Sequence, residues 1–336
     1  MKHCERIIGL EQISPGIGAM IKGWDIPETH FRDPNTLSVV DFRAMTNACP
    51  WDCFHCFTEK SPRTLSLDEI KSTIQQVAKQ GALSMQFIGE GEPSIDRNFL
   101  EILQCVSEQG MQPIVYTDGA TKFRDRDFVR AVKDTGTSII IKCDSLFNPE
   151  FQNAVLGDKK NEYFMKRAQA LELLMDEGFN ETQEDGTTRL GFDMVVCRSN
   201  MQEVERTLRF CRNKNLWIMF AFYLTSGRSN ADGFDNTQAL TDEEKARIID
   251  MVRGIDSKDY GYEHPVWNNF IVAPCVEMMQ IYGDGRVSPC PGNEQVIGNI
   301  REHTIAELHQ LILEKCSELH PSGFDGHCPY RSNPLK

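Results

Sequence analysis

The chain has 336 residues, of which 40% are hydrophobic and 25% are charged, so it can bury a sizeable core as one large domain or two smaller ones. This composition excludes disorder, collagen and coiled coil. A net charge of −13, from 36 Lys and Arg against 49 Asp and Glu, would repel a phosphate backbone, so nucleic acid is not an expected partner. The first residues lack an apolar signal segment, and the longest apolar run, residues 216–224, is too short to cross a bilayer. We therefore expect a cytoplasmic protein with no membrane partner.

Between residues 37 and about 225, short β-branched apolar runs alternate with longer segments of helical period, a pattern typical of βα units around a parallel sheet. The predicted strands cover residues 37–42, 85–88, 113–116, 138–141, 190–196 and 217–224. Helix signals lie between them: Ser66 and Glu69 form a capping box, and glycines end helices at Gly81, Gly110, Gly136 and Gly178. Six such units with right-handed crossovers predict an α/β fold, a partial (β/α)6 barrel similar to a TIM barrel, with its chemistry on the loops that follow the strands.

The chain changes character after the sixth strand. The polar stretch 229–238 indicates a boundary, and Thr241 with Glu244 opens a further helix. A hairpin is expected between residues 278–282 and 286–288, with Asp284 and Gly285 as its turn, and a last helix begins at Thr304. We therefore divide the chain into an N-terminal segment (1–36), the barrel (37–230), a linker helix (231–268) and a C-terminal extension of hairpin and helix (269–336).

Twelve cysteines are too few for a disulfide scaffold in a chain of this length and too many for ordinary core residues. Cys49, Cys53 and Cys56 are clustered directly after the first predicted strand. In a reducing cytosol, clustered thiolates usually indicate metal. Three thiolates on one loop can hold three corners of a four-iron cluster and leave the fourth iron open. Zinc is the alternative, but a zinc site needs a fourth ligand nearby, and His55 lies between two ligating positions.

The spacing Cys-x3-Cys-x2-Cys after the first strand resembles the signature of the radical S-adenosylmethionine (radical SAM) superfamily. A second motif supports the resemblance: Gly89-Glu90-Gly91-Glu92-Pro93 follows the second strand where that family carries Gly-Gly-Glu-Pro, with Glu90 in place of the first glycine. The resemblance implies a [4Fe-4S] cluster that binds S-adenosyl-L-methionine (SAM), and a flavodoxin or ferredoxin-type reductant. It also implies an enzyme that uses a 5′-deoxyadenosyl radical to abstract a substrate hydrogen.

The resemblance further implies which residues bind SAM. The Gly91 backbone and the Glu92 carboxylate would meet its ammonium, and the His55 side chain would lie against the adenine. Thr117 and Asp118 end the third strand where the family often has Thr-Asn-Gly, near the ribose. Arg198, just past the fifth strand, is a candidate partner for the SAM carboxylate, because a guanidinium matches a carboxylate. The alternative for Arg198 is a surface arginine at a strand end.

Cys275, nine residues, Gly285, four residues and Cys290 form a second spacing, similar to the opening half of the SPASM and twitch extensions that carry auxiliary iron-sulfur clusters. Only Cys316 and Cys328 follow, which favours the shorter twitch type with one auxiliary cluster of the [4Fe-4S] kind. Cys328 fits as the third ligand. The fourth could be Asp325, His327, Cys316 or the substrate, although helix packing also explains Cys316. Zinc is again the alternative metal for this terminal set of ligands.

The motifs do not select the reaction. Only 48 residues precede Cys49, too few for a separate peptide-recognition domain, and one auxiliary cluster resembles the small-molecule branch of the superfamily. We therefore expect an oxidoreductase or epimerase that abstracts hydrogen from a sugar, aminocyclitol or nucleoside. The alternative is a maturase that modifies a side chain of a ribosomal peptide or a protein. A non-catalytic binding module stabilised by metal would not explain the motif at Gly91 and Glu92.

Catalytic candidates follow from the fourth and fifth strands. Lys142 and Asp144 alternate with apolar neighbours, and Asp193 lies within the fifth strand, so some of these side chains should project into the barrel. A carboxylate or lysine there could take a substrate proton, whereas a structural ion pair is the alternative. Epimerisation needs a hydrogen donor on the opposite face of the substrate, for which Cys143 and Cys197 are the candidates, although a lone buried cysteine is usually inert.

Overall fold

The computed structural model describes residues 16–25, 36–43, 45–56, 58, 62–223, 236–263, 278–290 and 295–319. Its strands form one nine-stranded sheet in the order β6-β5-β4-β3-β2-β1-β7-β8-β9. The strands are β1 (Val39–Phe42), β2 (Ser84–Phe87), β3 (Gln112–Thr117), β4 (Ser138–Lys142), β5 (Leu190–Val196), β6 (Trp217–Phe222), β7 (Met278–Ile281), β8 (Arg286–Ser288) and β9 (Gly298–Asn299). Strands β1 to β7 run parallel, whereas β8 and β9 are antiparallel to their neighbours.

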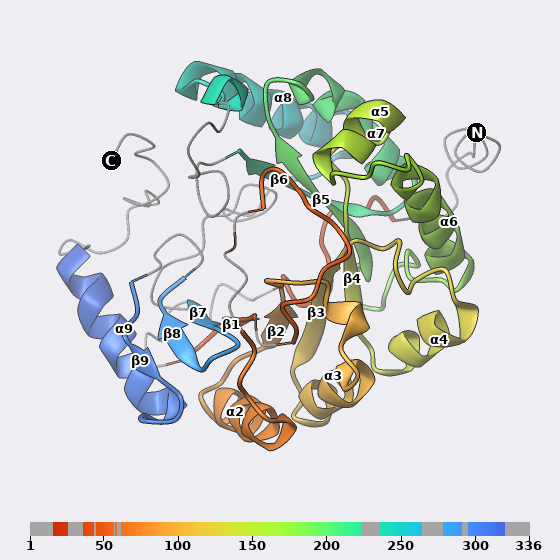
Figure 1. The fold of residues 1–336 in the computed structure, drawn as a ribbon. Helices are drawn as coiled ribbons and strands as arrows, with labels where there is room; N and C mark the ends of the chain where they lie inside the picture. The colour runs from red at the N-terminus through yellow and green to blue at the C-terminus, as the bar shows by residue number, and fades with distance from the viewer. Residues whose placement is uncertain are drawn as a thin grey trace.

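Helices cover the outer face of this curved sheet, as Figure 1 shows. They are α2 (Leu67–Lys79), α3 (Phe99–Glu108), α4 (Arg126–Asp134), α5 (Pro149–Val155), α6 (Tyr163–Asp176), α7 (Val204–Asn213), α8 (Asp242–Tyr260) and α9 (Ile305–Leu319). Short 3-10 turns lie at η2 (Pro93–Ile95), η3 (Met201–Glu203) and η5 (Asn236–Gln238). Strands β6 and β9 are the two ends of the strand order, so the sheet stays open within the described residues. The predicted α/β class and partial barrel are therefore confirmed.

The local sequence signals explain why these elements begin and end where they do. Ser66 and Thr241 cap α2 and α8, each through a complete capping box with the glutamate three residues later. Gly110, Gly136 and Gly178 follow α3, α4 and α6 with φ of 77°, 74° and 78°, a conformation that favours glycine. The six predicted strands match β1 to β6 to within a few residues at each end.

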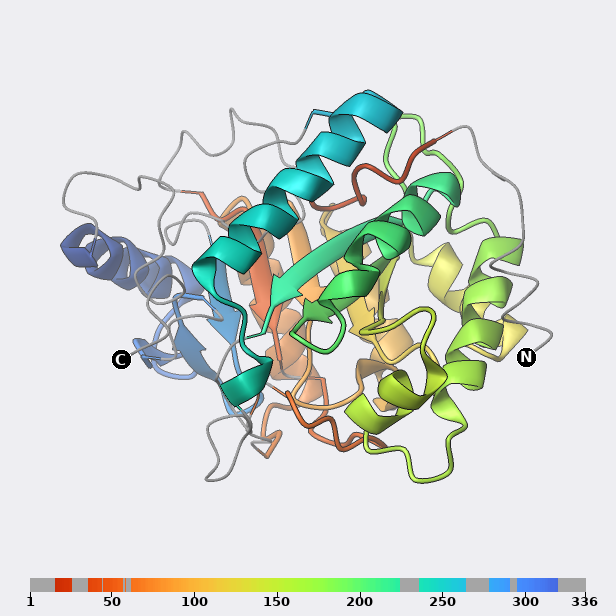
Figure 2. The same ribbon diagram turned by 90° about the horizontal axis from the view of Figure 1, so that it is seen from above.

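The two faces of the sheet have different cores. Outside, strand residues pack against the helices in a large apolar layer. Inside, a smaller cluster fills the barrel: Ile21, Trp24, Val39, Ile114, Tyr116, Ile140, Trp217 and Met219. Ile21 and Trp24 come from segment 16–25, and Ile21 forms a β-bridge with Thr188, just before β5. In Figure 2 this dark red segment and the red-orange loop after β1 lie at opposite ends of the barrel. Segment 16–25 therefore seals the amino end of the strands, which the sequence pattern did not indicate.

The C-terminal hairpin is built onto the barrel. Strand β7 pairs in parallel with β1, with Val39 opposite Met278, and β8 and β9 extend the same sheet. The expected hairpin and its Asp284-Gly285 turn are therefore present, but the hairpin continues the barrel sheet. No described helix is both long enough and apolar enough to cross a membrane.

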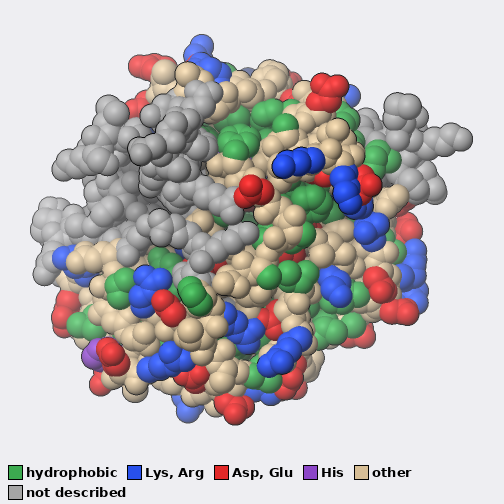
Figure 3. Space-filling model, in the orientation of Figure 1, with side chains coloured by type: hydrophobic (Ala, Val, Ile, Leu, Met, Phe, Trp, Pro, Cys, Tyr) green, Lys and Arg blue, Asp and Glu red, His purple; other side chains and the backbone are tan. Residues whose placement is uncertain are grey.

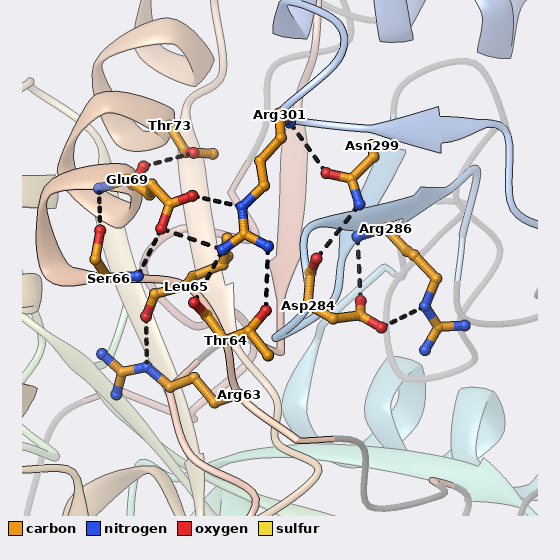
Figure 4. A network of polar contacts seen from close by, with 10 residues as sticks. All are labelled: Arg63, Thr64, Leu65, Ser66, Glu69, Thr73, Asp284, Arg286, Asn299 and Arg301. Atoms are coloured by element: carbon orange, nitrogen blue, oxygen red, sulfur yellow. Dashed lines mark hydrogen bonds and ion pairs between the residues drawn. The ribbon is translucent and has the colours of Figure 1, made fainter.

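A polar network joins this extension to α2 (Figure 4). The Arg301 guanidinium, between β9 and α9, binds the Glu69 carboxylate and donates to the Thr64 carbonyl. Further along, the Ile305 amide donates to the Gln76 side chain at 3.2 Å. These contacts fix the start of α9 against the α2 surface.

Candidate active site

The cysteine loop, described for residues 45–56 and 58, follows β1 and crosses the front of the barrel in Figure 1. Hydrogen bonds of its backbone fix it on two sides. The Ala48 carbonyl accepts from the Glu92 amide after β2, at 2.8 Å. The Asp52 and Phe54 amides donate to residues 156 and 155 at the end of α5, at 3.0 and 3.1 Å. The protein therefore holds this loop in a defined shape by bonds to other elements.

Trp51 adds a third attachment of the cysteine loop. Its indole Nε1 donates to the Asp118 carboxylate at 2.5 Å, and its ring packs edge-on against Tyr163 with 5.0 Å between centroids. The Tyr163 hydroxyl in turn lies 2.9 Å from the carbonyl oxygen of Asp118 and 3.0 Å from that of Lys142, and these two acceptors share its one proton. Sequence reasoning missed Trp51 and Tyr163. The signal for Trp51 was its place between two clustered cysteines.

Asp118 is engaged differently from the expectation. Its carboxylate accepts from the Ala120 and Thr121 amides, the Thr121 hydroxyl and the Trp51 indole. Four donors leave little capacity for a ribose hydroxyl. In this structure the side chain holds the cysteine loop against the end of β3. A place near the ribose stays a prediction.

Gly91 lies where a side chain cannot fit. A Cβ on this residue would come within 2.5 Å of the Thr46 carbonyl oxygen and 2.8 Å of the Asn47 carbonyl carbon, and it would also strike the Ala48 carbonyl. All of these atoms belong to the backbone of the cysteine loop, which cannot rotate away as a flexible side chain can. The glycine after β2 is thus what lets the two motifs pack together.

Glu92 is buried beside Gly91. Its carboxylate accepts from the Thr117 hydroxyl and the Asp118 amide, both at 2.7 Å, and from the Ser94 amide at 3.1 Å. Burial, and then the neighbouring Asp118 carboxylate, raise the pKa of Glu92 to about 8. No cation among the described residues pairs with it. An ammonium ligand would supply that missing charge and favour the ionised carboxylate. Binding of the SAM ammonium by Glu92 stays a prediction.

The three clustered thiols lie close enough to influence one another. Burial raises the pKa of Cys53 to about 12, and the charges of Cys49 and Cys56 add to this effect. Within the described residues, no three His, Cys, Asp or Glu side chains come together closely enough to hold a single metal ion.

His55 is buried next to the end of β4. Its Nε2 lies 3.5 Å from Asp144 Oδ1 and has no hydrogen-bond partner among the described residues. Burial, and then the Lys142 cation, lower the pKa of His55 to about 4. The imidazole is therefore neutral near pH 7, as a ring that packs against a base would be. Contact with adenine stays a prediction.

Lys142, Asp144 and Asp193 form a charged group inside the barrel. Lys142 Nζ lies 3.0 Å from Asp144 Oδ1, and Asp193 is opposite Lys142 in the pairing of β4 with β5. Burial lowers the pKa of Lys142, but the two carboxylates outweigh it and leave it raised. Burial also raises the pKa of Asp193 to about 6. One oxygen of Asp144 and one of Asp193 have no hydrogen-bond partner among the described residues, so both can still accept.

The two thiol candidates lie in different surroundings. Cys143 is fully buried in the layer between the sheet and the helices, because it alternates with the inward side chains of Lys142 and Asp144. It does not face the barrel interior, and this corrects the expectation that it could give hydrogen to a substrate there. Cys197 is buried just after β5, within electrostatic reach of Asp144 and Lys142, and stays a candidate.

Arg198 has partners outside the site. Its guanidinium makes two bonds to the Glu244 carboxylate, at 2.7 and 2.8 Å, and also donates to the Thr237 and Ala239 carbonyls. The side chain is exposed and joins the end of β5 to α8. Four of its five N–H donors are thus engaged away from the cysteine loop. Binding of the SAM carboxylate by Arg198 stays a prediction.

Of the proposed ligands of the auxiliary cluster, the structure describes the side chain of Cys290 alone. Cys290 is buried two residues after the end of β8. Cys275, Asp325, His327 and Cys328, and the side chain of Cys316, lie outside the described residues.

On the face shown in Figure 3, Lys and Arg side chains are scattered among Asp and Glu.

The site is thus a loop of three thiols packed on a glycine and a buried carboxylate, at the carboxyl end of an open α/β barrel. Residues 44–211 match the family model described as the Radical SAM superfamily. The chain therefore belongs to the radical SAM superfamily. Members use a [4Fe-4S] cluster and SAM, and the residues present here fit both: three thiols for the cluster, and Gly91 with Glu92 for the SAM ammonium.

Curated relatives share modest identity with the chain. Fe-coproporphyrin III synthase of Methanosarcina barkeri is 22% identical over 214 residues, 62% of this chain and 49% of the relative. GTP 3′,8-cyclase of Haemophilus ducreyi is 25% identical over 234 residues, 64% of each protein. Sporulation killing factor maturation protein SkfB of Bacillus subtilis is 22% identical over 288 residues, 81% of this chain and 65% of the relative. The chain spans between about half and two thirds of these relatives.

Solved structures share the fold. Native anSMEcpe with bound AdoMet and Cp18Cys peptide has a TM-score of 0.63 at 15% identity, covering 87% of this chain and 86% of that one. Streptococcus suis SuiB bound to precursor peptide SuiA has a TM-score of 0.61 at 14% identity, covering 84% and 66%. At these identities the likeness shows the fold alone. The shared fold includes strands outside residues 44–211, the range that the family model matches.

Proposed function

We propose that this radical SAM enzyme modifies a side chain of a peptide or a protein. The observation that carries the proposal is the extent of the similarity to SkfB, which covers 81% of this chain and so reaches beyond residues 44–211. The similarity to the GTP cyclase of H. ducreyi covers 64%. The fold shared with anSMEcpe and SuiB, both solved with peptides bound, agrees with this proposal.

A small polar substrate, which the sequence pattern placed first, becomes the second candidate. One observation favours it: Lys142, Asp144 and Asp193 make the barrel interior polar, and two carboxylate oxygens there still lack a donor. Hydroxyls of a sugar or nucleoside would suit those oxygens. A peptide backbone amide or a polar side chain would suit them equally, so this feature does not outweigh the relatives.

When bound, the cluster and SAM supply the one-electron cleavage that yields a 5′-deoxyadenosyl radical. The chain's own residues bind and orient. Glu92 would receive the SAM ammonium, and Asp193 would hold a proton that leaves the substrate, with Lys142 fixing the carboxylate. We also retain an auxiliary cluster at Cys275, Cys290 and Cys328 as part of the proposal.

The test compares two fractions of a cell extract as sources of substrate for the enzyme. The anaerobically reconstituted protein is incubated with SAM and dithionite, once with peptides and proteins and once with small metabolites. We expect the peptide and protein fraction to stimulate 5′-deoxyadenosine release several-fold, and mass spectrometry to find a SAM-dependent mass change on one side chain. Stimulation by the small metabolites alone would establish the second candidate. A Cys53→Ala variant, which lacks one proposed cluster ligand, should release no 5′-deoxyadenosine with either fraction.

The role of Asp193 predicts a pH dependence. Asp193 faces Lys142, Asp144 and Tyr116 inside the barrel, and its pKa is raised to about 6. A proton acceptor works in its ionised form, so product formation should rise as pH increases through about 6 and then level off. Asp193→Asn removes the titrating group, and we expect roughly 100-fold less product with that rise abolished. An unchanged pH profile in Asp193→Asn would exclude Asp193 as the acceptor.

A further inference from the structure

Thr58 lies on the cysteine loop, two residues after Cys56. Its hydroxyl oxygen is 3.4 Å from the Cys56 sulfur, and its carbonyl oxygen is 3.8 Å from the same atom. The residue is 1% exposed, so water does not satisfy the hydroxyl. Among the described residues, the Cys56 sulfur is the hydrogen-bond partner of this hydroxyl. We propose that Thr58 raises the reduction potential of the iron-sulfur cluster through this hydrogen bond.

The direction of the bond follows from the chemistry of the sulfur. In the free thiol, either atom could be the donor. A sulfur that binds iron is a thiolate and carries no proton, so the hydroxyl has to donate. The inference therefore depends on Cys56 being a cluster ligand. It does not depend on the class of substrate.

The effect on the potential follows from charge. Reduction adds one electron to the cluster and increases the negative charge on its sulfur ligands. A hydrogen bond to sulfur becomes stronger as that charge grows, so it stabilises the reduced state more than the oxidised one. Thr58 should therefore make the cluster easier to reduce.

The environment of the other ligands makes the contact specific. Among the described residues, Cys53 has no hydroxyl donor; its sulfur lies instead in the field of the Lys142 and Asp144 charges. Removal of the Thr58 hydroxyl would thus change one corner of the cluster. The charges around Cys53 would be left intact.

The experiment is a redox titration of the reconstituted protein, followed by electron paramagnetic resonance and performed without substrate. Thr58→Val keeps the shape of the side chain and removes the donor. We expect the equilibrium constant for reduction to fall by roughly threefold to tenfold, where tenfold is about 59 mV for one electron. Thr58→Ser keeps the hydroxyl and should stay close to the wild-type potential. Iron per chain is measured for every variant.

Thr207→Val is the matched control. Thr207 is fully buried on α7, and its hydroxyl has no hydrogen-bond partner among the described residues, so the same chemical change should leave the potential unaltered. Equal midpoints for Thr58→Val and wild type would overturn the proposal, as would a Ser variant that shifts as far as Val. A Thr58→Val protein that loads no cluster would also overturn it, because Thr58 would then act in assembly. Since no substrate is present, none of these results bears on peptide modification.

Discussion

Gly91→Ala should abolish loading of the SAM-binding cluster while the barrel still folds. The added Cβ would press on three consecutive carbonyl groups of the cysteine loop, 46 to 48, and the loop would have to move. Displacement of a reacting group by about 1 Å can cost about 100-fold in rate, so we expect at least that loss in 5′-deoxyadenosine release. Iron per chain should fall from about eight to about four if the auxiliary cluster is present. Iron that remains in this variant would belong to the auxiliary cluster, so the same measurement tests whether that cluster is present.

Gly254→Ala is the matched control for this prediction. Gly254 lies within α8, and a Cβ there would meet nothing within 4 Å. Alanine in a helix is more favourable than glycine by about 0.5–1 kcal/mol, so this variant should keep its iron and gain slightly in stability. Normal iron loading and SAM cleavage in Gly91→Ala would show that the cysteine loop tolerates the displacement, and the packing argument would be wrong.

Asp256→Ala should lower the free energy of unfolding by about 3–5 kcal/mol, because it leaves a buried guanidinium without its anion. Asp256 on α8 and Arg212 on α7 are both fully buried and share two hydrogen bonds of 2.8 Å. Arg212 also donates to the Gly18 carbonyl at 2.6 Å, so the same side chain ties segment 16–25 to the two helices. Urea denaturation of the reconstituted protein measures the change.

Asp259→Ala is the corresponding control on the same helix. Asp259 pairs with Arg209 at 2.7 Å, but both side chains are exposed, and such pairs contribute about 0–1 kcal/mol. Replacing both buried partners, as in Arg212→Leu with Asp256→Leu, should recover part of the lost stability. A cost for Asp256→Ala no larger than that for Asp259→Ala would contradict the argument.

The sequence was sufficient for the barrel because its signals are local. Apolar runs, the capping boxes at Ser66 and Thr241, and the glycines after helices depend on neighbours a few residues apart. The two motifs of the site were also readable, since each lies directly after a strand. Their contact at Gly91 follows from the parallel order of β1 and β2.

The sequence did not predict contacts between residues far apart in the chain, and the alternation of side chains along β4 was misinterpreted at one position. Asp118 is held by Trp51, which comes from another loop, and Arg198 is held by Glu244, which comes from another helix. No pattern in the sequence announces such pairs. Cys143 is different, because side chains alternate along a strand, so placing Lys142 and Asp144 inside already required Cys143 to lie outside. The sequence motifs did not select the substrate class, which stays a matter of proposal.

The pairing of β1 with β7 has a consequence for biosynthesis. Strand β1 is translated long before Met278–Ile281, so one of its edges stays unpaired until that strand is made. An unpaired strand edge can join with other chains, and contacts between distant parts of a chain form slowly. The nascent polypeptide must therefore keep this edge protected until β7 has been translated. Because the cysteine loop extends from β1, we expect iron insertion into the finished site only after β7 has been translated and has paired with β1.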